Sequence, residues 1–564
     1  MASLRVLISA CLAVLGAVLG AVLGAVLGAV LWAAPAIAAP PKPRLIVAIS
    51  IDQFSLDLFQ KYHPTFTGGL KRLSAGRVFA GYQSHGATET CPGHSTLLTG
   101  DHPSRTGIAA NSWWDRKTRT GVYCVAALES RDPLAKSSAM LRVDTLGDWM
   151  RRADPAARSI AVSGKDRAAI MMAGHHPSAV YWWNDGLGFG TSRYAGPANA
   201  ATLAPAARFN AQLFANWRKQ PPRLWPSGIP PRCAALQKPF TFGKVSRSGQ
   251  IPPQSARDVE SGAGWMMRPE FSSELHASPS FDPLALDFAG ELVEANRLGR
   301  GRATDLLSIS LSSTDYVGHR YGPGGPEMCV HLAGLDQALG LFFGRLDRLR
   351  VPYLVMLTAD HGSVDAPERL GPPAERIDAD ALMAALSADL RARFGLTYEP
   401  LAGDDPRQLY LNLQAPDAPR RDAITRAALQ WLKARAEVSA AFSAAEVAAA
   451  VPPRGKPAPQ LTLAERFNES FVPERSGDII VAFREGATLG VPQGMRDSVA
   501  GHGSPWDYDR RVPILFWWPG VHPKTEGAPI ETVDIAPTLA AVLGVRPPPV
   551  DGRCVEIGQG CKQR

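Results

Sequence analysis

The sequence lacks a dense run of lysine and arginine. Its 60 basic and 52 acidic residues leave a formal net charge of +8 over 564 residues, a mild excess for a chain of this length. Proteins that hold nucleic acid in a groove concentrate basic residues on one face or stripe, so the composition does not favour nucleic acid as a dedicated partner. A mildly basic surface suits small anionic substrates instead.

Cysteine is also scarce, and the spacing of the seven residues does not resemble the ligand framework of a zinc finger. One of them, Cys11, lies in an apolar N-terminal segment, which leaves an even number beyond it. Those six are Cys91, Cys124, Cys233, Cys329, Cys554 and Cys561. An even number permits disulfides in an exported protein. Cys554 and Cys561 are close in sequence and are the pair that we expect first.

Charge is nearly absent from the first 40 residues, MASLRVLISACLAVLGAVLGAVLGAVLGAVLWAAPAIAAP, which contain one arginine. A long apolar run followed by the small-x-small site Ala36-Ile37-Ala38 is typical of a secretory signal peptide. We therefore expect residues 1–38 to be removed and the mature chain, 39–564, to be periplasmic or secreted. The apolar run is also long enough to span a bilayer, so an uncleaved membrane anchor is the alternative.

Nothing in the bulk composition indicates disorder, since 45% of the residues are apolar and 20% are charged. Continuous apolar runs that end in polar residues recur at RLIVAISID (44–52), RSIAVSGKD (158–166), DLLSISLSSTD (305–315) and PYLVMLTADHG (352–362). Such runs are typical of buried parallel strands, and helical patterns such as 327–349 lie between them. The alternation predicts an α/β fold with a doubly wound, mostly parallel sheet, in which ligands bind at the carboxyl ends of the strands.

Two stretches interrupt this rhythm. Residues of about 175–285 are rich in Pro, Gly, Trp and Ser, and residues of about 366–480 contain alanine-rich helical patterns and the strand-like segment QLYLNL. We interpret both as insertions that form a cap or side region over one catalytic domain. The core resumes with RVPILFWWPG (511–520) and ETVDIAPTLAAVLG (531–544).

Two common hydrolase motifs are missing. A sulfatase needs Cys or Ser in the pattern C/S-x-P-x-R, whereas TCPGHS has Cys91 directly before Pro92 and no arginine. A serine hydrolase of the α/β type needs G-x-S-x-G, whereas GHSTL ends in Leu97. Neither class fits this chain.

What the sequence does contain is GATETCPGHSTLLTG (86–100), which places Thr90 at a turn that opens a helix. The start of a helix offers N–H groups and a positive dipole end that suit an anion such as phosphate. A threonine hydroxyl stays protonated at neutral pH, so Thr90 needs a metal or a base before it can act as a nucleophile. The alternative is that Thr90 simply caps the helix.

Acidic and histidine residues follow the expected strands. They are Asp52, Asp315 and His319 in STDYVGH, Asp360 and His361 in TADHG, and His502 in AGHGSPW. Singly, each is an ordinary turn or loop residue. Together with Thr90 they supply three carboxylates, three imidazoles and one hydroxyl, a set that suits two zinc ions about 4 Å apart for in-line phosphoryl displacement.

The order Asp, Thr-x-x-Gly-His, Asp-x-x-x-His, Asp-His and a late Gly-His resembles the alkaline phosphatase superfamily. The resemblance is to its PafA-type zinc phosphatases with a threonine nucleophile, which are related to nucleotide pyrophosphatase/phosphodiesterases. It implies that Thr90 is the nucleophile and two Zn²⁺ ions per chain are the cofactors. One ion would be held by Asp315, His319 and His502. The other would be held by Asp52, Asp360 and His361 and would ionise the Thr90 hydroxyl, which joins it as a ligand.

The resemblance also implies substrate contacts. Asn111 in GIAANSWWD would bind a phosphoryl oxygen, and Lys165 and Arg167 in SGKDR would do the same and mark a phosphomonoesterase. The expected partners are small phosphorylated substrates, with a covalent phosphothreonine intermediate, and a monomer is the expected state. A phosphodiesterase on the same scaffold is the enzymatic alternative. A metal-binding pseudoenzyme is an alternative of another class.

Overall fold

The computed structural model describes residues 42–132, 134–193, 195–254 and 264–561. The expected signal peptide, 1–38, lies outside the described residues. Across the part of the chain that is described, every helix is too short or too polar to cross a bilayer.

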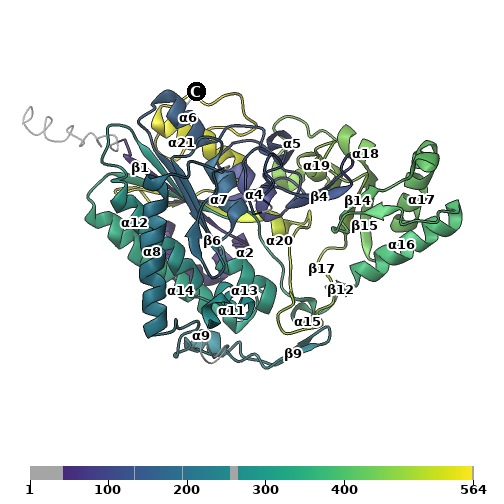
Figure 1. The fold of residues 1–564 in the computed structure, drawn as a ribbon, viewed down its shortest axis with the longest axis horizontal. Coiled ribbons are helices and arrows are strands. Elements are labelled where there is room, and N and C mark those ends of the chain that lie inside the picture. The colour runs from purple at the N-terminus through teal and green to yellow at the C-terminus, as the bar shows by residue number, and fades with distance from the viewer. Residues whose placement is uncertain (1–41, 133, 194, 255–263, 562–564) are drawn as a thin grey trace, which may run out of the picture. The chain divides into compact units, whose positions relative to one another are not determined.

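A large central sheet forms the core of the described residues (Figure 1). Its strands lie in the order β19 (Lys524–Thr525), β2 (Arg77–Tyr82), β18 (Arg511–Trp517), β11 (Tyr353–Thr358), β1 (Leu45–Ile51), β10 (Asp305–Leu311), β5 (Ser159–Ser163), β6 (Ala179–Asn184) and β7 (Gly188–Gly190), and β20 (Ile530–Glu531) also pairs with β2. Strands β11, β1, β10, β5 and β6 are parallel neighbours. The predicted α/β class with a mostly parallel sheet is confirmed.

Helices cover both faces of this sheet because alternate residues of its strands point to opposite sides. Leu45, Val47 and Ile49 of β1 pack in a cluster with residues of α12 (Phe281–Ala295) and α14 (Pro326–Arg348). Ile46 and Ala48 pack on the other side with α6 (Leu146–Ala153) and α21 (Ile535–Leu543). Figure 1 shows α12 and α14 on one side of the sheet and α6 and α21 on the other. Strands buried on both faces explain the uninterrupted apolar runs of the sequence.

The remaining elements near the carboxyl ends of the strands position the site. They are α2 (Leu56–Tyr62), α4 (Thr90–Leu97), α5 (Pro103–Thr106), the hairpin β3 (Ser112–Asp115) and β4 (Thr120–Tyr123), α7 (Asp166–Ala173), α13 (Ser313–Tyr321) and α20 (Asp507–Arg510). Helix α3 (Gly69–Ser74) packs instead on α14. Helix α4 contacts α7, so the segment that begins at Thr90 lies beside the segment that follows Lys165.

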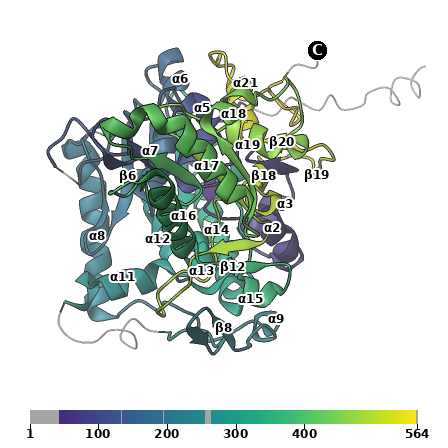
Figure 2. The same ribbon diagram turned by 90° about the vertical axis from the view of Figure 1, so that its right-hand side faces the viewer.

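A smaller sheet is built from the second irregular stretch, 366–480, and the residues just after it. We call it the side sheet. Its strands are β13 (Leu401–Ala402), β14 (Gln408–Leu411), β16 (Ile479–Phe483) and β15 (Val438–Ser443), in that order. Helices α16 (Ala379–Phe394) and α17 (Arg421–Lys433) share a separate apolar cluster with it, and they face the viewer in Figure 2. Short helices α18 (Ala444–Ala449) and α19 (Leu463–Asn468) and the pair β12 (Glu375–Ile377) and β17 (Ala487–Leu489) complete this region.

The first irregular stretch, about 175–285, is divided between core and surface. Strands β6 and β7 continue the central sheet, whereas α8 (Ala200–Lys219), α9 (Pro231–Ala234), the hairpin β8 (Phe240–Phe242) and β9 (Val245–Arg247), and α11 (Pro269–His276) lie outside it. Three disulfides join described residues: Cys91–Cys124, Cys233–Cys329 and Cys554–Cys561. The expected Cys554–Cys561 pair is therefore present.

Candidate active site

The predicted site residues come together at the carboxyl ends of the central strands. Asp52 follows β1, Asp360 and His361 follow β11, and Asp315 and His319 lie on α13 directly after β10. His502 arrives from the loop before α20 and β18. Parallel strands place their carboxyl ends at one edge of the sheet, where Asp52 lies. Because β18 is antiparallel to β11, its amino end lies at the same edge, and the loop before it brings His502, 450 positions after Asp52 in sequence, to this site.

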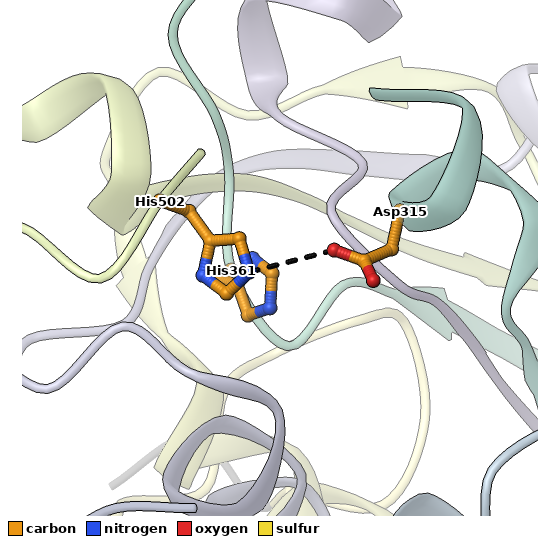
Figure 3. A group of neighbouring side chains, drawn as sticks. All are labelled: Asp315, His361 and His502. Carbon is orange, nitrogen blue, oxygen red and sulfur yellow. Dashed lines mark ion pairs between the residues drawn. The ribbon is translucent and has the colours of Figure 1, made fainter. Parts of the chain in front are cut away.

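One group of possible metal ligands contains Asp315, His361 and His502, whose ligand atoms all lie within 4.8 Å of one another (Figure 3). The Nε2 atom of His502 lies 3.4 Å from Oδ1 of Asp315, and the rings of His361 and His502 are stacked with centroids 3.7 Å apart. The Nε2 atom of His319 lies 3.2 Å from the same carboxylate oxygen. Asp315 is thus within reach of three imidazoles.

A second group contains Asp52, Asp360 and His361, and all three side chains are buried. The Nε2 atom of His361 lies 3.5 Å from Oδ1 of Asp52 and 3.4 Å from Oδ2 of Asp360. His361 therefore stands between the two groups. The resemblance assigned His361 to the second ion, together with Asp52 and Asp360. It assigned His319 to the first ion, together with Asp315 and His502.

Each imidazole is oriented by its other ring nitrogen. The Nδ1 atoms of His319, His361 and His502 donate to the backbone carbonyls of Ala500, Gly362 and Thr88, at 3.0, 3.0 and 2.8 Å. A carbonyl only accepts, so each bond fixes the tautomer with the proton on Nδ1 and leaves Nε2 as a lone-pair donor. This is the state in which histidine binds a metal.

The residues present fit divalent cations. Within the described part of the chain, Oδ1 of Asp52, Oδ2 of Asp360 and Nε2 of His361 are buried without a hydrogen-bond partner. Burial, followed by repulsion from Asp360, raises the pKa of Asp52, and burial lowers the pKa of His361. Orphaned acceptors of this kind cost free energy, and a divalent cation bound by oxygen and imidazole nitrogen ligands satisfies them.

Thr90 is the first residue of α4, and the N-cap position is occupied by Glu89. Thr90 is therefore not the capping residue. The amides of the first turn offer less to an anion than the sequence suggested, because the Cys91 N–H is donated to Oδ1 of Asn111 at 2.8 Å and Pro92 has no N–H. Side chains must supply most of the positive charge around Thr90.

Arg167 and Lys165 are cationic side chains at this site. The Nη2 atom of Arg167 donates to Oγ1 of Thr90 at 3.3 Å. The Lys165 ammonium lies 2.6 Å from Oδ2 of Asp52 and 2.5 Å from Oδ2 of Asp315, between the two groups. Burial alone would raise the pKa of Asp315, but Lys165 and His319 outweigh it and hold that pKa well below its usual range.

Gln53, Glu89 and His94 also contact the site residues, and of these Gln53 and Glu89 were not predicted from the sequence. Gln53 has a left-handed backbone, with φ of 65°, and its amides donate to Asp360 and Asp315. His94 lies 3.0 Å from Oδ2 of Asp360 and donates to the Thr90 carbonyl. Glu89 accepts from the backbone N–H of Asn111 at 2.7 Å and from Arg407 at 3.2 Å. His94 is the histidine of the Thr-x-x-Gly-His motif and was visible in the sequence. For Gln53 and Glu89 the available signal was their position beside Asp52 and Thr90, since nothing in these residue types marks a site.

A cavity of about 590 Å³ opens over these groups. Thr90, Asn111 and His319 line it from the central sheet side, and Arg407 and Tyr410 line it from the side sheet. The volume exceeds what an ion of the size of inorganic phosphate needs, so a larger ligand has room here. A separate group of His102, Glu469 and Glu531 lines another cavity and takes no part in this site.

Comparison with known proteins fits this geometry. The family described as type I phosphodiesterase / nucleotide pyrophosphatase matches residues 46–505, and the chain belongs to that family. The chain is 40% identical to alkaline phosphatase PhoK of Sphingomonas sp over 546 residues, and the aligned region covers 93% of each chain. The chain is also 39% identical to alkaline phosphatase PhoD of Zymomonas mobilis over 540 residues, and the aligned region covers 91% of this chain and 88% of that protein.

Among solved structures, the crystal structure of alkaline phosphatase PafA superposes with a TM-score of 0.78 at 25% identity, and the match covers 92% of this chain and 99% of that one. The resemblance to PafA-type phosphatases that the motifs indicated is therefore confirmed.

Proposed function

We propose that this protein is a phosphomonoesterase that hydrolyses small phosphate monoesters through a covalent phosphothreonine on Thr90. The observation that carries the proposal is the position of Thr90 at the start of α4. Its hydroxyl lies 3.3 Å from Arg167, and the residue lines the cavity together with Asp315, His319 and His502. The relatives named as alkaline phosphatases support the monoester over the diester substrate.

The ligand set of the resemblance supports two zinc ions, one held by Asp315, His319 and His502 and the other by Asp52, Asp360, His361 and Thr90. When bound, zinc supplies a Lewis acid that lowers the pKa of the threonine hydroxyl and neutralises charge on the leaving oxygen. The buried acceptors Oδ1 of Asp52 and Oδ2 of Asp360 support this assignment.

The chain's own groups then carry out two displacements. The Thr90 hydroxyl gives up its proton, its oxygen attacks phosphorus and the new O–P bond forms. The bond from phosphorus to the leaving oxygen breaks, and the leaving oxygen takes up a proton and departs as the alcohol. Water then attacks the phosphothreonine, the Oγ–P bond breaks, and inorganic phosphate leaves while Thr90 regains its proton. The carboxamide oxygen of Asn111 accepts a hydrogen bond from the Cys91 backbone N–H. The NH₂ group of Asn111 is therefore the part of the side chain that can donate to a phosphoryl oxygen.

Arg167 and Lys165 favour the monoester. A monoester carries nearly two negative charges on its phosphoryl oxygens, whereas a diester carries one and has a second substituent. Two cations gain most from the doubly charged group. Arg167 binds two oxygens through its planar fork, and Lys165 adds a point charge.

We also propose that the chain is exported, with residues 1–38 removed as a signal peptide. Three disulfides between described residues support an oxidising compartment such as the periplasm or the medium. N-terminal sequencing of native protein should find Ala39 as the first residue. A native chain that keeps residues 1–38 in the membrane fraction would establish the anchor instead.

The function is tested with purified protein of known metal content. Rates on 4-nitrophenyl phosphate and bis(4-nitrophenyl) phosphate should differ by at least about 100-fold in kcat/KM in favour of the monoester, the scale of one lost oxyanion contact. Thr90→Ala should lose most activity while keeping its fold and metals. A faster diester reaction would establish the phosphodiesterase, and a Thr90→Ala protein with near wild-type rate would remove Thr90 from the mechanism.

A further inference from the structure

Arg407 connects the side sheet to the surroundings of the nucleophile. It precedes β14 in the segment GDDPR (403–407), and its Nε donates to Oδ1 of Asp405 at 2.8 Å, which fixes the guanidinium. From there Nη1 donates to the backbone carbonyl of His502 at 2.6 Å, and Nη2 donates to Oε1 of Glu89 at 3.2 Å. One side chain thus holds two segments that are more than 400 residues apart in sequence.

The Glu89 end of this connection leads to the substrate-binding residue. The other oxygen of Glu89, Oε2, accepts from the Asn111 backbone N–H at 2.7 Å. Glu89 is 8% exposed and precedes Thr90 directly. A buried carboxylate beside the nucleophile would repel a phosphate dianion, and the Arg407 guanidinium compensates that charge.

The contact of Arg407 with the backbone of His502 does not involve Glu89 or Asn111. Gly503 has φ of +99°, and a Cβ at that position would lie 1.8 Å from Nη1 of Arg407. The backbone conformation favours glycine at position 503, and a side chain there would also displace the Arg407 guanidinium from its place beside His502. The second glycine of AGHGS is explained by the space that Arg407 needs beside His502.

We propose that Arg407 is a positioning residue, which holds Asn111 in place through Glu89 and anchors the main chain at His502. The inference rests on the proposed phosphatase function. Arg407 itself does not enter the reaction. Its planar fork serves two acceptors at once, which a lysine ammonium on a flexible stem does not reproduce.

The experiment is a double-mutant cycle on kcat/KM for 4-nitrophenyl phosphate with Arg407→Gln and Asn111→Ala. We expect Arg407→Gln to lower kcat/KM by at least about tenfold in the wild-type background and by less than about threefold in the Asn111→Ala background, since coupled residues are not additive. Arg407→Lys should recover part of the loss. The matched control is Arg421→Gln, because Arg421 pairs with Asp478 at the side sheet and contacts none of the site residues.

Three outcomes would overturn the inference. The first is an Arg407→Gln protein within twofold of the Arg421→Gln control. The second is full additivity with Asn111→Ala. The third is a loss that disappears at saturating zinc, which would place the whole effect on metal binding. If Arg407→Gln does not fold, Glu89→Gln replaces it in the same cycle with the same expected coupling. An inactive wild-type protein would instead contradict the proposed function, so the two failures are distinguishable.

Discussion

The Nη2 atom of Arg167 lies 3.3 Å from the Oγ1 atom of Thr90. The hydroxyl is almost fully buried, and the guanidinium reaches it from the start of α7. A phosphoryl group bound to Thr90 therefore lies within reach of a fixed, permanently charged donor.

Arg167→Ala should consequently lower the monoester rate far more than the diester rate. One lost oxyanion donor costs about 3 kcal/mol, or about 10²–10³-fold in kcat, and the doubly charged substrate loses more of this stabilisation. Kinetics on 4-nitrophenyl phosphate and its bis ester measure the ratio, with Arg152→Ala on the exposed face of α6 as the control. An equal loss on both substrates would show that selectivity for monoesters arises elsewhere. Lys165→Ala is a less direct test, because Lys165 also pairs with Asp52 and Asp315.

Removing a metal ligand should remove metal. Asp360→Ala and His502→Ala should each lose about one of two zinc equivalents, because a site with an open coordination position holds its ion poorly. Mass spectrometry of the metal content after dialysis measures this, and the exposed His522→Ala serves as control. The pair His319→Ala and His361→Ala is decisive for the ligand assignment. If His319→Ala keeps its full zinc content, the ligand beside Asp315 and His502 is His361 rather than His319.

The disulfide between Cys91 and Cys124 should matter for catalysis as well as stability. The backbone N–H groups of these two cysteines donate to Oδ1 and to the carbonyl of Asn111, at 2.8 and 3.0 Å. A Cys91→Ser/Cys124→Ser protein should lose about 2–4 kcal/mol of stability and show a lower kcat/KM because Asn111 is less well held.

The control for this prediction is Cys554→Ser/Cys561→Ser. That bridge closes a separation of 7 residues rather than 33 and lies near the C-terminus. Thermal melting and kinetics on both double variants make the comparison. Equal kinetic effects in the two would show that the Cys91–Cys124 bridge has no special role at Asn111.

The strands and the metal-ligand candidates were predictable from the sequence because both depend on local pattern. A strand buried on both faces is an unbroken apolar run, and Asp52 or Asp360 at its end is visible as a change of polarity. The direction of β18 was not visible, since such a run looks the same whether the strand is parallel or antiparallel. Arg407 and Glu89 acquire their positions through contacts 318 residues apart. The Cys91–Cys124 pairing likewise does not follow from spacing.

Buried His331 on α14 should make stability depend on pH. Burial lowers the pKa of His331 to about 3, from 6.5 in the unfolded chain. As the pH falls below 6.5 the unfolded state binds the extra proton first, so the stability that is present above pH 6.5 is lost toward pH 3, by up to about 1.4 kcal/mol per pH unit. Nearby Asp282, with a pKa raised to about 6, acts in the opposite direction between pH 6 and 3.8.

Because Asp282 is retained in both proteins, comparing wild type with His331→Gln isolates the histidine. Glutamine does not titrate and can keep the bond that Nε2 of His331 makes with Thr314 at 2.9 Å. The drop in Tm between pH 7 and pH 5 should be smaller in His331→Gln than in wild type. Exposed His522→Gln should leave the drop unchanged. Identical drops in all three proteins would contradict the prediction.

The place of β18 has a consequence for how the chain folds after synthesis. This strand, Arg511–Trp517, lies between β2 and β11 in the central sheet, so β2 cannot join the rest of the sheet until nearly the whole chain is available. His502 arrives only a few residues earlier. Long-range pairings of this kind fold slowly, and an emerging chain stays without activity until its last tenth is present. A fragment that ends before His502 is therefore a divided sheet with an incomplete set of ligand candidates rather than a smaller enzyme.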